Sequence, residues 1–81
     1  MKYTVNVTQE DIDKGKKGSC SQCPVALAGI RSVGKSFYVG PTMFAFRFNW
    51  IAELPKCVVD FIERFDSGQP VQPFTFDIEI P

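Results

Sequence analysis

Residues 20–28 read CSQCPVALA, which places a proline directly after a pair of cysteines and before a run of small apolar side chains. Proline is tolerated in the first turn of a helix because the amide hydrogen that it lacks has no partner there. Small side chains after it let the helix lie close to a sheet. The stretch therefore predicts a helix that begins near Pro24, and Gly34 is expected to end it.

The residues before this helix predict a strand, a short helix and a loop. Apolar and polar residues alternate over residues 3–8, as in a half-buried strand. Thr8 is followed three residues later by Asp11, which approximates a capping box, so residues 9–14 are expected to form a short acidic helix. Residues 15–19, GKKGS, offer no apolar face and predict a loop.

Residues 37–48 predict a β-hairpin around the turn sequence GPT at residues 40–42. A row of phenylalanines on its second strand must face something apolar, because exposed rings would favour aggregation. Arg47 is expected on the opposite face of this strand, next to Met43 and Ala45. Residues 50–51 are expected to continue the strand past an irregularity at Asn49.

The last third of the chain predicts an amphipathic helix and a final strand. Apolar side chains recur with helical spacing after Pro55, and Gly68 is expected to end this helix. The apolar positions are Val58, Phe61, Ile62 and Phe65. Residues 74–80 alternate again and predict a strand.

The resulting order, β-α-α-β-β-α-β, predicts a single α+β domain over residues 1–81. We expect the two terminal strands to pair with each other and beside the hairpin, in one small antiparallel sheet of about four strands with the helices packed on one face. Two hairpin-like halves that meet in a dimer are the alternative arrangement.

The composition favours a packed fold and argues against several classes of function. The chain is 44% hydrophobic with eight phenylalanines, which is unlike a disordered protein. Its formal net charge of zero argues against general nucleic-acid binding, and it does not oppose a homodimer. No run approaches the roughly 20 apolar residues of a membrane span, and residues 1–4 lack the apolar stretch of a signal peptide. We therefore expect a cytoplasmic protein with no membrane partner.

The cysteine pair at the helix start could bind a metal, form a reversible disulfide or expose a thiolate stabilised by the helix dipole. A closed zinc site needs four ligands, and Cys57 is the one cysteine besides Cys20 and Cys23 in a chain without histidine. A complete site would need a carboxylate or a second subunit. The simpler interpretation is that Cys23 caps the helix and packs as a small apolar residue while Cys20 folds inward with it, so we expect no metal and no other cofactor.

The loop before the helix is the first candidate binding segment. Backbone amides at a helix N-terminus and flanking lysines favour an anion. The sequence does not match a P-loop, so ATP hydrolysis is not implied. The segment would suit a phosphorylated small molecule or an acidic partner surface, and the alternative is a solvated loop whose lysines only aid solubility. Its candidate ligand-binding residues are Lys14, Lys16, Lys17, Ser19 and Ser21.

Aromatic residues supply the other candidates. Tyr38 and Trp50 could stack on a planar base or anchor a protein interface, and Arg47 could clamp an anion. Phenylalanine rows with a period of two are more often core, and we assign them to packing. The residues so assigned are Phe44, Phe46, Phe48, Phe74 and Phe76.

Groups that could perform catalysis are missing from the sequence. Without histidine, a serine or cysteine nucleophile would need an unusual base. The acidic residues, Asp11 among them, are expected at solvent-facing helix and strand positions. The sequence therefore predicts a protein that is not an enzyme.

Three blocks of the sequence carry a resemblance, namely IDKG at residues 12–15, CSQCPVALA at 20–28 and FDSGQPVQPF at 65–74. In this order they resemble a family of small uncharacterised accessory proteins of bacteriophages and prophages. The resemblance names no activity. Small phage accessory proteins often inhibit host machinery or bind immune signalling nucleotides, so an anti-defence role in the cytoplasm of the host bacterial cell is among the functions that it implies.

The leading hypothesis is therefore a non-enzymatic phage accessory protein that sequesters a phosphorylated small molecule or inhibits a host protein. The rival hypothesis is a metal-binding or redox module that uses Cys20 and Cys23 across a homodimer, with Cys57 as a further candidate metal ligand. The metal content of the purified protein separates the two hypotheses.

Overall fold

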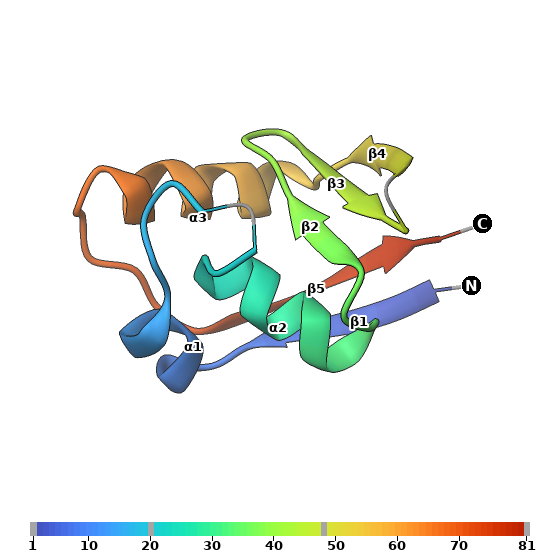
Figure 1. The fold of residues 1–81 in the computed structure, drawn as a ribbon. Coiled ribbons are helices and arrows are strands. Elements are labelled where there is room, and N and C mark those ends of the chain that lie inside the picture. Colours follow the sequence, from blue (N-terminus) through green and yellow to red (C-terminus); the bar gives the residue numbers. More distant parts are fainter. Residues whose placement is uncertain (1, 20, 48, 81) are drawn as a thin grey trace.

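The computed structural model describes residues 2–19, 21–47 and 49–80, which contain three helices and five strands (Figure 1). The elements are β1 (Lys2–Val7), α1 (Gln9–Lys14), α2 (Pro24–Ser32), β2 (Phe37–Val39), β3 (Met43–Phe46), β4 (Asn49–Glu53), α3 (Lys56–Asp66) and β5 (Phe74–Glu79). Helices combined with small antiparallel sheets confirm the predicted α+β class.

The strands form two sheets, one of β1 with β5 and one in the order β2-β3-β4. The predicted pairing of the terminal strands is confirmed, with Lys2 opposite Glu79 and Val7 opposite Phe74. The hairpin strands form a sheet of their own and do not extend the terminal pair, so the expected single sheet is divided in two. Helix α2 packs against both β1 and β2, and it lies alongside both sheets in Figure 1.

β4 is a separate strand and not a continuation of β3. The chain reverses after Phe46, so that Asn49 pairs back with Phe46 and Trp50 with Ala45. Arg47 lies in this turn with a φ of 53°, and its amide donates to the carbonyl of Ser36 at 3.1 Å. The prediction that residues 50–51 continue the same strand is wrong because this turn intervenes.

The core collects apolar side chains from both sheets and from α2 and α3. Phe37 of β2 stacks on Phe44 of β3, with 5.7 Å between the ring centroids. Gly29 lets α2 approach β2 closely, because a β-carbon at this position would overlap the Phe37 ring. Of the phenylalanines assigned to packing, Phe44 and Phe76 are buried, Phe46 and Phe74 are partly buried against the core, and Phe48 lies outside the described residues.

Asp11 joins the first helix to the rest of the fold. Thr8 and Asp11 form the predicted capping box of α1. The Asp11 carboxylate also accepts two hydrogen bonds from Arg31 of α2, at 2.8 and 2.9 Å, and Arg31 donates to the carbonyl of Asn6 at 2.9 Å. Asp11 is only 4% exposed, so the expectation of a solvent-facing carboxylate is wrong, since Arg31 compensates its charge. Hydrogen bonding to Arg31 holds the pKa of Asp11 below its ordinary value, although burial acts in the opposite direction.

Glycines follow both longer helices, as predicted. Gly68 has a φ of +80°, its amide donates to the carbonyl of Phe65 at 3.1 Å, and the amide of Gln69 donates to that of Arg64 at 2.9 Å. These two bonds form a Schellman motif, which ends α3. Helix α2 ends with Val33 as its C-cap, and Gly34 follows directly.

Candidate functional site

Cys23 caps the second helix. Its sulfur accepts a hydrogen bond from the amide of Ala26 at 3.4 Å, and its side chain is buried in the core. This geometry matches the simpler interpretation for Cys23. Cys20 lies outside the described residues, so the pair itself has no described geometry.

The third cysteine belongs to a different part of the surface. Cys57 is exposed and lines a groove between α3 and residues 70–74, whereas Cys23 lines a small cavity beside Gly18 and Ser19. Over residues 2–19, 21–47 and 49–80, no group of three or more histidine, cysteine or acidic side chains could hold a metal ion. Cys23 and Cys57 therefore do not line one common site.

The lysine-glycine loop is folded onto itself. The amide of Lys16 donates to the carbonyl of Gln22 at 2.8 Å, and the amide of Cys23 donates to the carbonyl of Ser19 at 3.3 Å. The hydroxyl of Ser19 accepts the amide of Gln22 at 3.0 Å, and Ser21 is half-buried. Several polar groups that could have faced an anion thus bind within the loop.

Further polar groups of this loop contact the C-terminal end of helix α3. The amide of Gly18 donates to the Asp66 carboxylate at 3.0 Å. The ammonium of Lys17 lies beside Gly68, at the negative C-terminal end of the dipole of α3. A β-carbon built on Gly68 would lie 3.2 Å from its Nζ atom. Lys14 lies apart from this arrangement, 3.5 Å from Glu10 on α1. The anion that this loop holds in the structure is therefore the protein's own carboxylate.

The N-terminus of α2 offers few amides to a ligand. Pro24 has no amide hydrogen, and the amide of Ala26 already donates to Cys23. Pro24 and Val25 are both fully buried. The arrangement provides a rigid helix start and little of the donor array that a phosphate needs.

The structure brings two of the aromatic candidates together. Tyr38 of β2 and Trp50 of β4 both pair with Ala45 of β3, so all three side chains lie on one face of the three-stranded sheet. The opposite face carries Phe37 and Phe44 into the core. Trp50 is 62% exposed and is the one large apolar side chain so exposed among the described residues.

Gly40 determines how closely the indole of Trp50 approaches the turn between β2 and β3. A β-carbon on Gly40 would lie 3.1 Å and 3.2 Å from the ring atoms Cη2 and Cζ3. The indole is thus held against the backbone, and with the turn it forms a shallow apolar hollow. The hollow is lined by Gly40, Pro41, Thr42, Met43 and Trp50.

Glu53 shares this face because of an irregularity between β3 and β4. Glu53 pairs with Met43 and Trp50 pairs with Ala45, and the register shifts by one residue between these pairs. Met43 and Ala45 are two residues apart on one strand, so they point the same way, and their partners do also. We call Tyr38, Met43, Ala45, Trp50 and Glu53 the outer sheet face.

Arg47 does not belong to the outer sheet face. Its guanidinium carbon lies 5.2 Å from the centroid of the Phe46 ring, a cation-π contact within the turn. The expectation that Arg47 sits on a strand opposite the phenylalanines, next to Met43 and Ala45, is therefore wrong.

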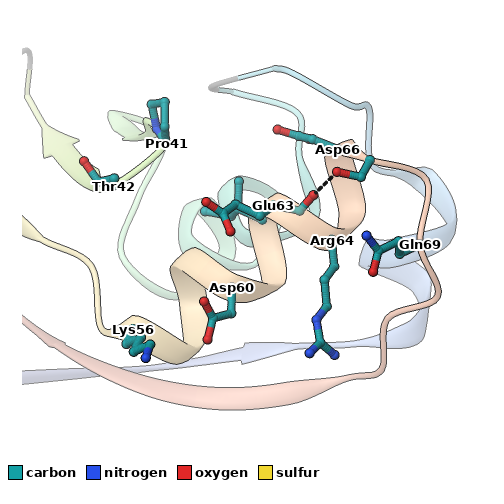
Figure 2. Close-up of a pocket in the computed structure, with 10 residues that line it drawn as sticks. Pro41, Thr42, Lys56, Asp60, Glu63, Arg64, Asp66 and Gln69 are labelled. Atoms are coloured by element: carbon teal, nitrogen blue, oxygen red, sulfur yellow. Dashed lines mark hydrogen bonds between the residues drawn. The ribbon is translucent and has the colours of Figure 1, made fainter.

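A groove of about 780 Å³ continues from the hollow toward α3 and shares Pro41 and Thr42 with it (Figure 2). In Figure 2 the side chain of Arg64 extends away from these two residues, and a hydrogen bond of 2.8 Å joins the Ser67 hydroxyl to the Glu63 carbonyl. The groove has charged residues of both signs, so it does not specify the charge of a ligand. They are Lys56, Asp60, Glu63, Arg64 and Asp66.

No family model matches the chain, and comparisons with curated proteins and with solved structures give no match either. No helix over the described ranges is long and apolar enough to cross a membrane. The fold and the site together define a small α+β protein with an exposed tryptophan on a sheet face.

Proposed function

We propose that this chain is a binding protein without catalytic activity, and that it recognises another protein through the outer sheet face. The observation that supports this proposal is the exposure of Trp50, at 62%, beside an apolar hollow. A large aromatic ring loses little conformational entropy on binding and buries much apolar area, which is why tryptophan is enriched among the residues that dominate interfaces.

A protein partner suits the molecule better than a phosphorylated small molecule. The loop that the sequence assigned to an anion directs its Gly18 amide to Asp66 and its Lys17 ammonium to the end of α3. A phosphate would have to displace this internal carboxylate before it gained the amide. Sequestration of a phosphorylated molecule therefore remains the weaker form of the proposal.

The resemblance to small phage proteins makes a host protein the expected partner. Inhibition of a host protein, including one that acts in defence against phages, is then the biological role that we propose. A homodimer stays compatible with this role, because a zero net charge does not oppose self-association.

Trp50→Ala tests the proposal. Wild type, Trp50→Ala and a control, Gln72→Ala, would be immobilised and exposed to bacterial lysate, with retained proteins quantified by mass spectrometry. Gln72 is exposed and precedes β5, outside the outer sheet face. We expect a partner retained by wild type and by the control and reduced about tenfold or more by Trp50→Ala. Equal retention by all three chains would contradict the proposal.

Binding of a phosphorylated small molecule can be tested separately by thermal unfolding. Ligand at 100 times its dissociation constant adds about 2.7 kcal/mol to the free energy of unfolding. A panel of cyclic and linear nucleotides would therefore raise the melting temperature clearly if one of them binds. If a nucleotide raises the melting temperature of wild type and of Trp50→Ala but not of Lys17→Ala, we would conclude that the ligand is a nucleotide and not a protein.

A further inference from the structure

Glu53 lies beside Trp50 on the outer sheet face. Their partners on β3, Met43 and Ala45, are two residues apart, which separates the two side chains by about 7 Å along the strand direction. The indole leans toward the same end, because its ring edge meets Gly40, and the Gly40 amide donates to the carbonyl of Met43 at 2.7 Å. An aromatic ring and a carboxylate are thus adjacent on an exposed surface.

The charge of Glu53 is not compensated within the described residues. Glu53 is exposed, and the ion pairs among the described residues involve other carboxylates, those of Glu10, Asp11 and Asp77. Of the two cations that flank Glu53 in the sequence, Arg47 stacks on Phe46 and Lys56 lines the neighbouring groove, and neither forms an ion pair with Glu53 among the described residues. Tyr38, Met43, Ala45 and Trp50 bring no charge to the face. The outer sheet face is therefore apolar with one free negative charge.

We propose that the outer sheet face binds an arginine side chain of the partner protein, stacked on Trp50 and paired with Glu53. This inference rests on the proposed function and names the chemistry of the partner. Guanidinium is planar, stacks on aromatic faces and forms two parallel hydrogen bonds with a carboxylate. A lysine ammonium is a compact, strongly hydrated charge without a planar face, so it cannot stack on the indole ring as a guanidinium does.

The irregularity between β3 and β4 gives this proposal its geometric reason. In a regular strand, residues 50 and 53 would point to opposite faces, and Glu53 would lie on the side of the buried Phe44. The extra residue on β4 turns the carboxylate to the solvent and beside the indole. Such irregularities often reorient a side chain next to a binding site.

A random-sequence peptide library without tryptophan tests the proposal. Peptides would be selected on wild type, and binding would be followed by the fluorescence of Trp50, the single tryptophan of the chain. We expect arginine to be enriched in the selected peptides, and its replacement by the neutral isostere citrulline to weaken binding about tenfold. We expect Glu53→Gln to weaken the arginine peptide about two- to fivefold, as for an exposed ion pair, and to leave the citrulline peptide unchanged.

Several results would overturn the proposal. They are selection of no peptide, selection of lysine as often as arginine, and equal effects of Glu53→Gln on the arginine and citrulline peptides. Circular dichroism and thermal unfolding verify that Glu53→Gln folds, which we expect of an exposed position. Trp50→Phe keeps an aromatic ring and is expected to retain part of the binding, although it needs a labelled peptide for detection.

Failure of this inference is distinguishable from failure of the proposed function. If Trp50→Ala abolishes retention of a partner from lysate while arginine is not enriched, the binding role stands and the arginine chemistry is wrong. If Trp50→Ala changes no retention, the binding role itself is wrong.

Discussion

Trp50 and Glu53 point to the same face of a three-stranded sheet although they are three positions apart along one strand. The register shift between β3 and β4 is the cause, because it inserts one residue between two pairs that are otherwise regular. An exposed indole and an exposed carboxylate become neighbours as a result. The candidate site thus depends on backbone pairing as much as on residue type.

The position of the indole depends on the turn between β2 and β3. Gly40 lies near the lysine-glycine loop although the two are far apart in the sequence, since Gly18, Ser19 and Gly40 line one small cavity. The turn therefore connects the outer sheet face with the part of the chain that the sequence had singled out as an anion site. The two candidate regions are neighbours. They differ because the Gly18 amide of the loop already binds Asp66, whereas Glu53 of the outer sheet face has no ion pair among the described residues.

Replacement of Asp11 by alanine should destabilise the fold. The substitution removes the capping box of α1 and both hydrogen bonds from Arg31. Arg31 is half exposed, so water can solvate its guanidinium again, and we expect a loss of about 1 to 3 kcal/mol in the free energy of unfolding. Urea unfolding at neutral pH measures it. Asp13→Ala, at an exposed position of the same helix, is the control and should change stability by less than about 0.5 kcal/mol.

The stabilisation by Asp11 should depend on pH in a defined direction. Arg31 and Thr8 hold the pKa of Asp11 below its ordinary value of 3.8. The carboxylate therefore contributes fully above the pKa of the unfolded chain, and the contribution is lost as pH falls through the lower pKa of the folded chain. We expect the stability difference between wild type and Asp11→Asn to stay constant from about pH 7 to pH 5 and to shrink below about pH 4. A difference that grows on acidification would contradict the assignment.

Local patterns in the sequence predicted local structure well. Thr8 and Asp11 predicted the capping box, Pro24 the start of α2, and Gly68 the end of α3, because each of these features depends on residues within one or two turns. Alternation over residues 74–80 predicted the last strand for the same reason. The side-chain role of Cys23 also followed from its position at a helix start.

Features that depend on distant partners were not predictable in this way. The reversal after Phe46 uses Arg47 with a positive φ and no glycine or proline, so the apolar alternation of residues 44–48 hides it. The burial of Asp11 requires Arg31, which lies 20 positions later. The register shift beside Trp50 has no signal in a single sequence, since alternation alone places Trp50 and Glu53 on opposite faces.

Gly29→Ala should destabilise the contact between α2 and β2. Alanine favours helix by about 1 kcal/mol over glycine, but its β-carbon would overlap the Phe37 ring in a filled core. We expect overpacking to prevail, with a net loss of about 1 to 3 kcal/mol in the free energy of unfolding. Leucine at position 37 leaves more room, so Gly29→Ala should cost at least about 0.5 kcal/mol less in the Phe37→Leu background. Equal costs in both backgrounds would show that the ring is not the obstacle.

Metal content and stability together test the role of Cys23. Its sulfur accepts the amide of Ala26 inside the core, so we expect protein purified without chelator to contain less than about 0.1 zinc per chain. Cys23→Ala removes the cap acceptor and should cost about 0.5 to 2 kcal/mol in the free energy of unfolding, whereas Cys23→Ser keeps an acceptor and should cost less. Elemental analysis and urea unfolding give the two readouts. Stoichiometric zinc that disappears in Cys23→Ser would instead support a metal-binding module and a ligand role for this cysteine.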